Sequence, residues 1–167
     1  MKTTQESMWR IYGTINEWIK FSDAKAGVIL ATNGIIAGAM LSDPTGLKEF
    51  LYQRPVFFIP LILAILTACF SIYFSLRCLN PTLNFGKQDS LIFFAHIAQK
   101  YETAEEYKSE AKKTFLDDDL ATSQIAEQIW VNSKISRRKF EAVNSATYFL
   151  VATIFISILS VLTVILL

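Results

Sequence analysis

The stretch FSDAKAGVILATNGIIAGAML, residues 21–41, decides how the rest of the chain is interpreted. Residues 26–41 carry no charge, and the charged pair Asp23 and Lys25 comes directly before them. Charged residues beside an apolar run are typical of a chain that enters a lipid bilayer. Two further apolar segments follow, and we therefore predict an integral membrane protein.

The composition supports a membrane protein. Of the 167 residues, 52% are hydrophobic and 19% are charged, whereas soluble domains contain about 25% charged residues. The uncharged segments 55–76 and 147–167 can each cross a hydrocarbon core of about 30 Å, which takes about 20 helical residues. The alternative is a soluble bundle of three buried helices, but two such segments without a polar face are rare in soluble proteins.

We predict an all-α membrane protein with three transmembrane helices and a small helical cytoplasmic domain between the second and the third. The expected parts are an amphipathic N-terminal helix at 1–22, transmembrane helices at 23–41, 55–76 and 146–167, an external loop at 42–54, and the cytoplasmic helical domain at 77–145. The N-terminal helix follows from apolar residues at helical spacing. Its apolar side is expected on the membrane surface or against the cytoplasmic domain, and the two are compatible.

The distribution of Lys and Arg predicts the orientation. Residues 1–25 carry four of them, the loop at 42–54 carries two, and the segment 77–139 carries ten. Cytoplasmic segments next to a membrane are enriched in Lys and Arg. The N-terminus and the middle segment are therefore predicted to be cytoplasmic, and the short loop and the C-terminus are predicted to face outward.

Capping residues predict where the helices of the middle segment begin. Asp89 or Ser90 is expected to cap a helix over residues 90–101. Thr103 and Glu106 have the spacing of a capping box for the next helix, which is expected to end near residue 115. At the other end of the chain, Thr3 or Thr4 is expected to cap the first helix.

A long helix is predicted for the C-terminal part of the chain. No glycine or proline occurs in residues 119–167, and the aspartates at 117–119 provide an N-terminal cap. One continuous helix of this length would measure roughly 70 Å at 1.5 Å per residue. It would link the cytoplasmic domain mechanically to the third transmembrane helix.

Small and polar residues in the first predicted span indicate contacts with protein. Gly34 and Gly38 form a GxxxG motif, a spacing that lets two helix backbones approach closely in lipid. The partner is either another span of the same chain or a second copy, so that a homo-oligomer is one of two expectations. Asn33 is expected to face protein or water, because a side-chain amide is costly to expose to lipid.

No catalytic motif and no metal site is predicted. His96 is the single histidine, which excludes a His-rich zinc site, and it is expected to be a partly buried helix residue. The chain has no phosphate-binding glycine loop, and no disulfide or metal site is expected from Cys69 and Cys78. We therefore predict a protein that is not an enzyme and has no cofactor. The net charge of +1 gives no indication of a nucleic acid polymer as partner.

A basic cluster formed by Lys134, Arg137, Arg138 and Lys139 has two interpretations. It is either an anchor that flanks the membrane on the cytoplasmic side, or a patch in which arginines hold a cyclic phosphate. Trp130 lies one helical turn before Lys134, where it would either stack on a base or pack against aromatic residues of the cytoplasmic domain. The hypothetical ligand-binding residues are Trp130, Lys134, Arg137 and Arg138.

Three stretches of the chain resemble a known family. WIKFSDAKAGVIL, residues 18–30, is similar to the signature of an aromatic residue followed by D-x-KA that opens the membrane effectors of Pycsar, a bacterial pyrimidine cyclase system for antiphage resistance. The motif residues are Asp23, Lys25 and Ala26. Residues 90–111 resemble the cytoplasmic helix pair of that family, and residues 127–151 resemble its helix leading into the last span. The resemblance covers nearly the whole chain, in order.

The resemblance implies a membrane effector in a two-gene defence. A neighbouring cyclase would make a cyclic pyrimidine mononucleotide such as cUMP or cCMP. The effector would bind this messenger and impair the bacterial inner membrane, so that the infected cell dies by abortive infection. The implied partners are membrane lipid, the cyclic nucleotide and further copies of the chain. The alternative, from another class, is a membrane scaffold or accessory subunit without a ligand that binds a protein partner through its cytoplasmic helices.

Overall fold

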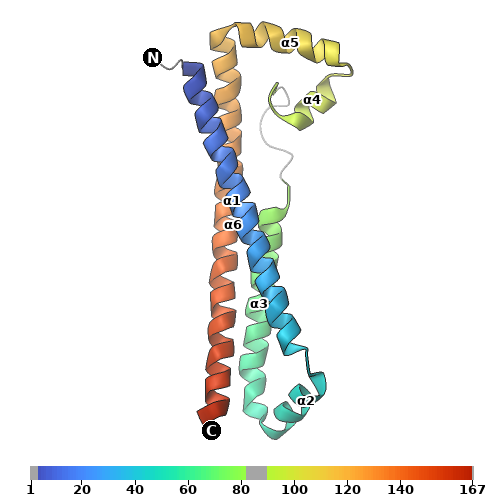
Figure 1. Cartoon of the computed structure of the whole chain (residues 1–167), viewed down its shortest axis with the longest axis vertical. Helices are drawn as coiled ribbons and strands as arrows, with labels where there is room; N and C mark the ends of the chain where they lie inside the picture. Colours follow the sequence, from blue (N-terminus) through green and yellow to red (C-terminus); the bar gives the residue numbers. More distant parts are fainter. Residues whose placement is uncertain (1–3, 82–89, 167) are drawn as a thin grey trace. The chain divides into compact units, whose positions relative to one another are not determined.

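The computed structural model describes residues 4–81 and 90–166, and within these residues every regular element is helical (Figure 1). The elements are α1 (Thr4–Met40), α2 (Pro44–Gln53), the 3-10 helix η1 (Pro55–Phe57), α3 (Phe58–Leu79), α4 (Phe94–Lys100), α5 (Ala104–Leu116) and α6 (Asp118–Leu166). The predicted all-α class is confirmed for this part of the chain.

The chain divides into two compact units. Unit 1 comprises Met1–Phe21 and Pro81–Arg138, and unit 2 comprises Ser22–Asn80 and Lys139–Leu167. Helices α1 and α6 each contribute residues to both units. Helices α4 and α5 belong to unit 1 alone, whereas α2 and α3 belong to unit 2 alone.

Two helical segments are long and apolar enough to cross a membrane, namely Pro55–Leu79 and Asp118–Ile165. Helices α1 and α2 count as a third span only if the pair, which is bent by 70°, is taken as one broken span. By length and composition, the described residues therefore provide two to three candidate spans. The predicted count of three is the upper end of that range.

Helix α1 does not break at residue 22, where the predicted N-terminal helix ends and the first predicted span begins. It runs as one helix over 37 residues, because no proline interrupts it and Gly13 lowers helix stability by only about 1 kcal/mol. Thr4 is its first residue, and Thr3, the other predicted cap, lies outside the described residues. The long C-terminal helix is confirmed as far as Leu166, since α6 runs unbroken over 49 residues.

The predicted external loop at 42–54 contains the helix α2. The Asp43 carboxylate accepts a hydrogen bond from the Gly46 backbone N–H at 2.9 Å, which caps the helix. Pro44 occupies the first helical turn. Backbone N–H groups in this turn have no intrahelical acceptor, so a proline without an N–H does not weaken the helix there. Asp43 and Pro44, which are residue types common in turns, therefore begin a helix here.

Helix α4 begins at Phe94, four residues later than predicted. The Ser90 hydroxyl oxygen accepts hydrogen bonds from the backbone N–H groups of Ile92 and Phe93 at 3.3 and 3.2 Å, so that Ser90 stabilises a turn before the helix. Asp89, the alternative cap, lies outside the described residues. His96 is on α4 and buried, and its Nδ1 accepts a hydrogen bond from the Ser90 N–H at 3.3 Å.

The predicted caps of α5 and α6 are confirmed. The Thr103 hydroxyl oxygen accepts a hydrogen bond from the Glu106 N–H at 3.3 Å. The returning bond differs from a regular capping box, because the Glu106 carboxylate accepts from the N–H of Glu102, one residue before the cap. At the start of α6, the Asp117 carboxylate accepts from the N–H groups of Asp119 and Leu120 at 3.0 and 3.1 Å.

In unit 1, polar contacts on one side of α6 accompany buried apolar residues such as Ala121 and Ile125. The Ser90 hydroxyl donates to the Gln128 side-chain oxygen at 2.8 Å, and the Gln128 amide donates to the Asn132 oxygen at 3.0 Å. Asn132 donates in turn to the Asn16 side chain of α1 at 2.7 Å. These bonds connect α6 both to the turn before α4 and to the first part of α1.

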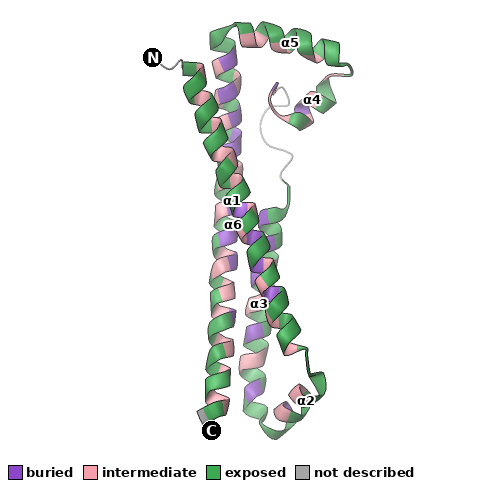
Figure 2. Cartoon of the chain, in the orientation of Figure 1, coloured by how far each residue is buried: buried purple, intermediate pink, exposed green. Residues whose placement is uncertain are grey.

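The core of unit 2, where α1, α3 and α6 meet, contains three alanines and a cysteine beside the larger Ile29 and Val143. Its buried members are Ala26, Ile29, Cys78, Ala142, Val143 and Ala146. Figure 2 shows buried residues as narrow stripes on these helices, whose remaining surface is largely exposed and carries many large apolar side chains. Small residues inside and large apolar residues outside are typical of helices that pack within a bilayer.

Candidate functional site

The interior of unit 2 contains an ion pair that joins three helices. The Lys139 ammonium group on α6 is bonded to the Asp23 carboxylate on α1 and also donates to the Cys78 carbonyl oxygen of α3 at 2.6 Å. The Lys139 side chain is 10% exposed and that of Asp23 is 37% exposed. A buried charge is tolerated when it is paired and hydrogen-bonded. Lys139 therefore depends on both partners.

This ion pair gives part of the D-x-KA stretch a structural role. Asp23 supplies the carboxylate, and Ala26 is fully buried in the core of unit 2. Lys25 lies between them and is half-buried. Lys139 was one of four residues in the predicted basic cluster, where it was expected to flank the membrane or to bind phosphate. The structure separates it from the other three, because it is buried and they are exposed.

A second polar contact lies further along the same helices. The Asn33 side-chain amide donates to the Ser71 hydroxyl oxygen at 2.9 Å, and the Ser71 hydroxyl donates to the Ala146 carbonyl oxygen at 3.0 Å. Asn33 is 2% exposed, which agrees with the expectation that it avoids lipid. Its Oδ1 atom is buried without a hydrogen-bond partner among the described residues, a state that costs roughly 1–3 kcal/mol.

A third polar contact joins α3 and α6 alone. The hydroxyl oxygens of Thr67 and Thr153 lie 2.8 Å apart, and Thr153 is fully buried. Together, the three contacts form what we call the polar seam of unit 2. Its members are Asp23, Asn33, Thr67, Ser71, Cys78, Lys139, Ala146 and Thr153.

Most of the polar seam was not predicted, although the sequence contains a signal for it. On α3, the seam residues Thr67 and Ser71 are four residues apart, which places them on one face of a helix. On α6, the polar residues Lys139 and Thr153 are separated by two heptads, which also keeps them on one face. Polar residues at helical spacing inside an apolar segment therefore mark the side that faces protein.

The four predicted ligand-binding residues lie on α6 within unit 1. Trp130, Lys134, Arg137 and Arg138 are all exposed, and their spacing of four, three and one residues keeps them on one side of the helix. The Trp130 side chain is 57% exposed. The Lys134 ammonium group lies 5.5 Å from the centre of its ring, a distance typical of a cation–π interaction.

The GxxxG motif lies on an open face of α1. A Cβ atom added to Gly34 or Gly38 would meet no atom within 4 Å, apart from the backbone of its own helix. Among the described residues, therefore, no other span of the same chain packs against these two glycines. Of the two expected partners, the second copy stays a prediction.

The family model described as Pycsar effector protein domain, PycTM, matches residues 7–167. The chain belongs to this Pycsar effector family. It is 24% identical over 141 residues to the Pycsar effector protein PtPycTM of Propioniciclava tarda, covering 83% of this chain and 69% of that protein. It is 28% identical over 171 residues to the Pycsar effector protein GmPycTM of Gulbenkiania mobilis, covering 87% of this chain and 85% of that protein. No solved structure matches the chain.

Membership of the Pycsar effector family confirms the resemblance drawn from the sequence. The family has an antiphage effector role, is associated with membranes and is not a known catalytic family. The matched residues include the whole polar seam and the exposed group around Trp130.

Proposed function

We propose that this chain is the membrane effector of a bacterial antiphage system and is activated by a cyclic nucleotide, cUMP or cCMP, from a partner cyclase. Activation impairs the inner membrane and causes abortive infection. The observation that carries the proposal is the match to the Pycsar effector family over residues 7–167. The two to three candidate spans support a site of action in the membrane.

In this proposal, residues 77–145 form the cytoplasmic sensor domain, the N-terminus is cytoplasmic, and the chain crosses the inner membrane at 23–41, 55–76 and 146–167. The compact units support this division in part, because they separate at residues 21 and 80, close to the predicted boundaries at 22 and 76, whereas the division at 138 lies seven residues before the predicted boundary at 145. Unit 2 has the apolar exterior that a bilayer requires, whereas unit 1 buries the hydrogen-bonded side chains of Gln128 and Asn132 beside apolar residues.

The messenger binds at the exposed group of Trp130, Lys134, Arg137 and Arg138. An aromatic ring offers a stacking surface for a pyrimidine base, and arginine pairs with phosphate through charge-assisted hydrogen bonds. Both kinds of side chain lie on one side of α6. Residue 139 follows Arg138 directly in the same helix, so that a displacement of α6 also displaces the Lys139 end of the buried ion pair.

Membrane impairment follows when α1, α3 and α6 separate. Separation exposes to lipid the seam side chains that lie inside the proposed spans, Asn33, Thr67, Ser71 and Thr153. Such exposure is unfavourable for amide and hydroxyl groups. These groups then draw in water or the polar groups of further copies of the chain. The open face at Gly34 and Gly38 on α1 is available for such a homo-oligomer, because an added Cβ meets nothing there.

A binding titration tests the activating ligand. The full chain in detergent is titrated by calorimetry with cUMP, cCMP and the non-cyclic nucleotide 5′-CMP. We expect binding of a cyclic pyrimidine nucleotide, and a loss of roughly tenfold in affinity, about 1.4 kcal/mol, in the Trp130→Ala variant. Trp18→Ala is the matched control, since Trp18 is also exposed, at 51%, and lies on another helix.

Two results of this titration would count against the proposal. If no cyclic nucleotide binds to the wild-type chain, the activation mechanism is wrong, and the scaffold with a protein partner becomes the better explanation. If Trp130→Ala and Trp18→Ala bind equally well, the ligand site lies elsewhere on the chain.

Cysteine labelling tests the orientation. Single cysteines at Thr45 and Lys100 are introduced into a chain in which Cys69 and Cys78 are replaced by alanine. In whole cells, a membrane-impermeant maleimide is expected to label position 45, because α2 lies in the predicted external loop, and to leave position 100 unlabelled until the cells are lysed. The opposite pattern would reverse the orientation inferred from the Lys and Arg distribution.

A further inference from the structure

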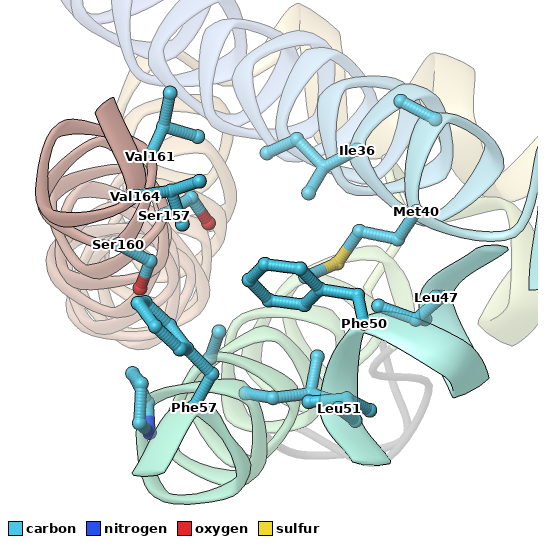
Figure 3. A pocket seen from close by; sticks show the side chains of 14 residues that line it. Ile36, Met40, Leu47, Phe50, Leu51, Phe57, Ser157, Ser160, Val161 and Val164 are labelled. Carbon is cyan, nitrogen blue, oxygen red and sulfur yellow. The ribbon is translucent and has the colours of Figure 1, made fainter. Parts of the chain in front are cut away.

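Unit 2 contains an apolar cavity of about 370 Å³, at the end of the unit that holds α2 (Figure 3). Residues from α1, α2, η1, α3 and the last turns of α6 line it. Figure 3 shows the side chains of Met40, Phe50 and Phe57 pointing into the same space. A cavity of this volume is in the range of roughly 300–1,000 Å³ typical of ligand pockets.

The lining has almost no polar group available to a ligand. Ser157 and Ser160 are the two hydroxyl-bearing residues of the lining. Each hydroxyl already donates to the backbone of its own helix, to the carbonyl oxygens of Thr153 and Ile156 respectively, both at 2.8 Å. The cavity therefore suits an apolar occupant and offers no anchor for the charged phosphate of a nucleotide.

Helix α2 presents an apolar face to the cavity and charged residues to the outside. Leu47, Phe50 and Leu51 line the cavity, whereas Lys48 and Arg54 are exposed. In the sequence, Lys48 directly follows the lining residue Leu47, and the exposed Glu49 comes next. Arg54 directly follows α2. Two cationic residues are therefore close in sequence to the apolar lining of the cavity. A phospholipid has the matching chemistry, because its phosphate can pair with a cationic side chain and its acyl group is apolar.

We propose that this cavity binds one acyl chain of a membrane phospholipid whose phosphate pairs with Lys48 and Arg54. Two of the elements that line it, α3 and α6, lie in the candidate spans Pro55–Leu79 and Asp118–Ile165, so that lipid chains surround it in a bilayer. An acyl chain that enters the cavity from the bilayer removes no apolar area from water, so its binding depends on van der Waals contacts with the lining and on the phosphate contacts. This lipid site does not depend on the nucleotide messenger or its binding residues.

Native mass spectrometry of the full chain tests the lipid site. The chain is reconstituted with phosphatidylglycerol, extracted in mild detergent and measured after release from the micelle. We expect one retained phospholipid per chain in the wild type and its loss in Ala39→Phe, because Ala39 lines the cavity and a benzyl group would fill it. Ala37→Phe is the matched control: Ala37 lies two residues away on α1, is exposed like Ala39, and is not among the lining residues.

A thermal measurement on the wild-type chain keeps the proposal testable if Ala39→Phe fails to fold. Adding lysophosphatidylglycerol, which has one acyl chain, to delipidated protein is expected to raise the melting temperature, whereas glycerol phosphate is expected to leave it unchanged. The proposal is wrong if the wild type retains no lipid, if Ala39→Phe and Ala37→Phe retain lipid equally, or if glycerol phosphate alone stabilises the chain. The proposal is also wrong if the wild type is a dimer in the mass spectra and Ala39→Phe is a monomer, because a second copy of the protein then occupies the cavity.

Discussion

Asp23→Leu is expected to destabilise unit 2 by about 3 kcal/mol, because it leaves the buried Lys139 ammonium group with the Cys78 carbonyl oxygen as its described partner. Removing one member of a buried ion pair costs about 3–5 kcal/mol. The lower value applies here because the Asp23 side chain is 37% exposed and water can screen part of the loss. Unfolding in mixed detergent micelles, followed by circular dichroism, measures the change in the free energy of unfolding.

The double variant Asp23→Leu/Lys139→Met provides the decisive comparison. It removes both charges, and an apolar pair of similar volume at a buried site is often neutral or stabilising compared with the ion pair. We therefore expect the double variant to be more stable than Asp23→Leu. Glu17→Leu, on the same helix but in unit 1 and exposed, serves as the control for loss of a surface carboxylate. If the double variant is as unstable as Asp23→Leu, the two charges are not coupled.

Inserting Gly-Gly between Arg138 and Lys139 is expected to abolish cell killing while nucleotide binding survives. The insertion lowers the stability of α6 by roughly 2 kcal/mol, at about 1 kcal/mol per glycine. It also turns residues 139–166 by about 200° relative to residues 118–138, at 3.6 residues per turn. The proposed binding residues on one side of the insertion can then no longer transmit a rotation to Lys139 on the other side.

A second insertion separates the rotation from a general disturbance of the helix. Four alanines at the same place turn the helix by about 400°, a net change of about 40°, and alanine is the strongest helix former. We expect this variant to retain partial killing. Depolarisation of cells supplied with the messenger is the readout, and a blot must show membrane levels equal to those of the wild type. If the Gly-Gly variant still depolarises cells, the signal does not pass along α6.

The helices of this protein could largely be predicted from the sequence. The continuous α6 follows from the absence of glycine and proline in residues 119–167, and the caps at Thr103 and Asp117 follow from the side chains themselves. The start of α4 was predicted four residues too early, because the Ser90 hydroxyl stabilises a turn as readily as it caps a helix. A single residue type does not distinguish these two local structures.

The candidate site was predicted less completely. Helical spacing alone predicts that Trp130 and the basic residues after it share one side of α6. The structure adds that this side is exposed, as the proposed ligand site requires. The partner of Lys139 was missed, since the charge of Lys139 next to an apolar segment also suits a residue that flanks the membrane.

By itself, the sequence determined the helical class and the apolar segments, because composition, periodicity and capping act between residues close together in the chain. The family was indicated by the resemblance of three stretches of the sequence. Only the tertiary structure decided which polar residues meet. Asp23 and Lys139 are 116 residues apart, and Asn33 and Ser71 are 38 residues apart. Such pairs depend on the rotation of each helix about its own axis, and that rotation is set by the packing of small residues such as Ala26 and Ala146 in the core of unit 2.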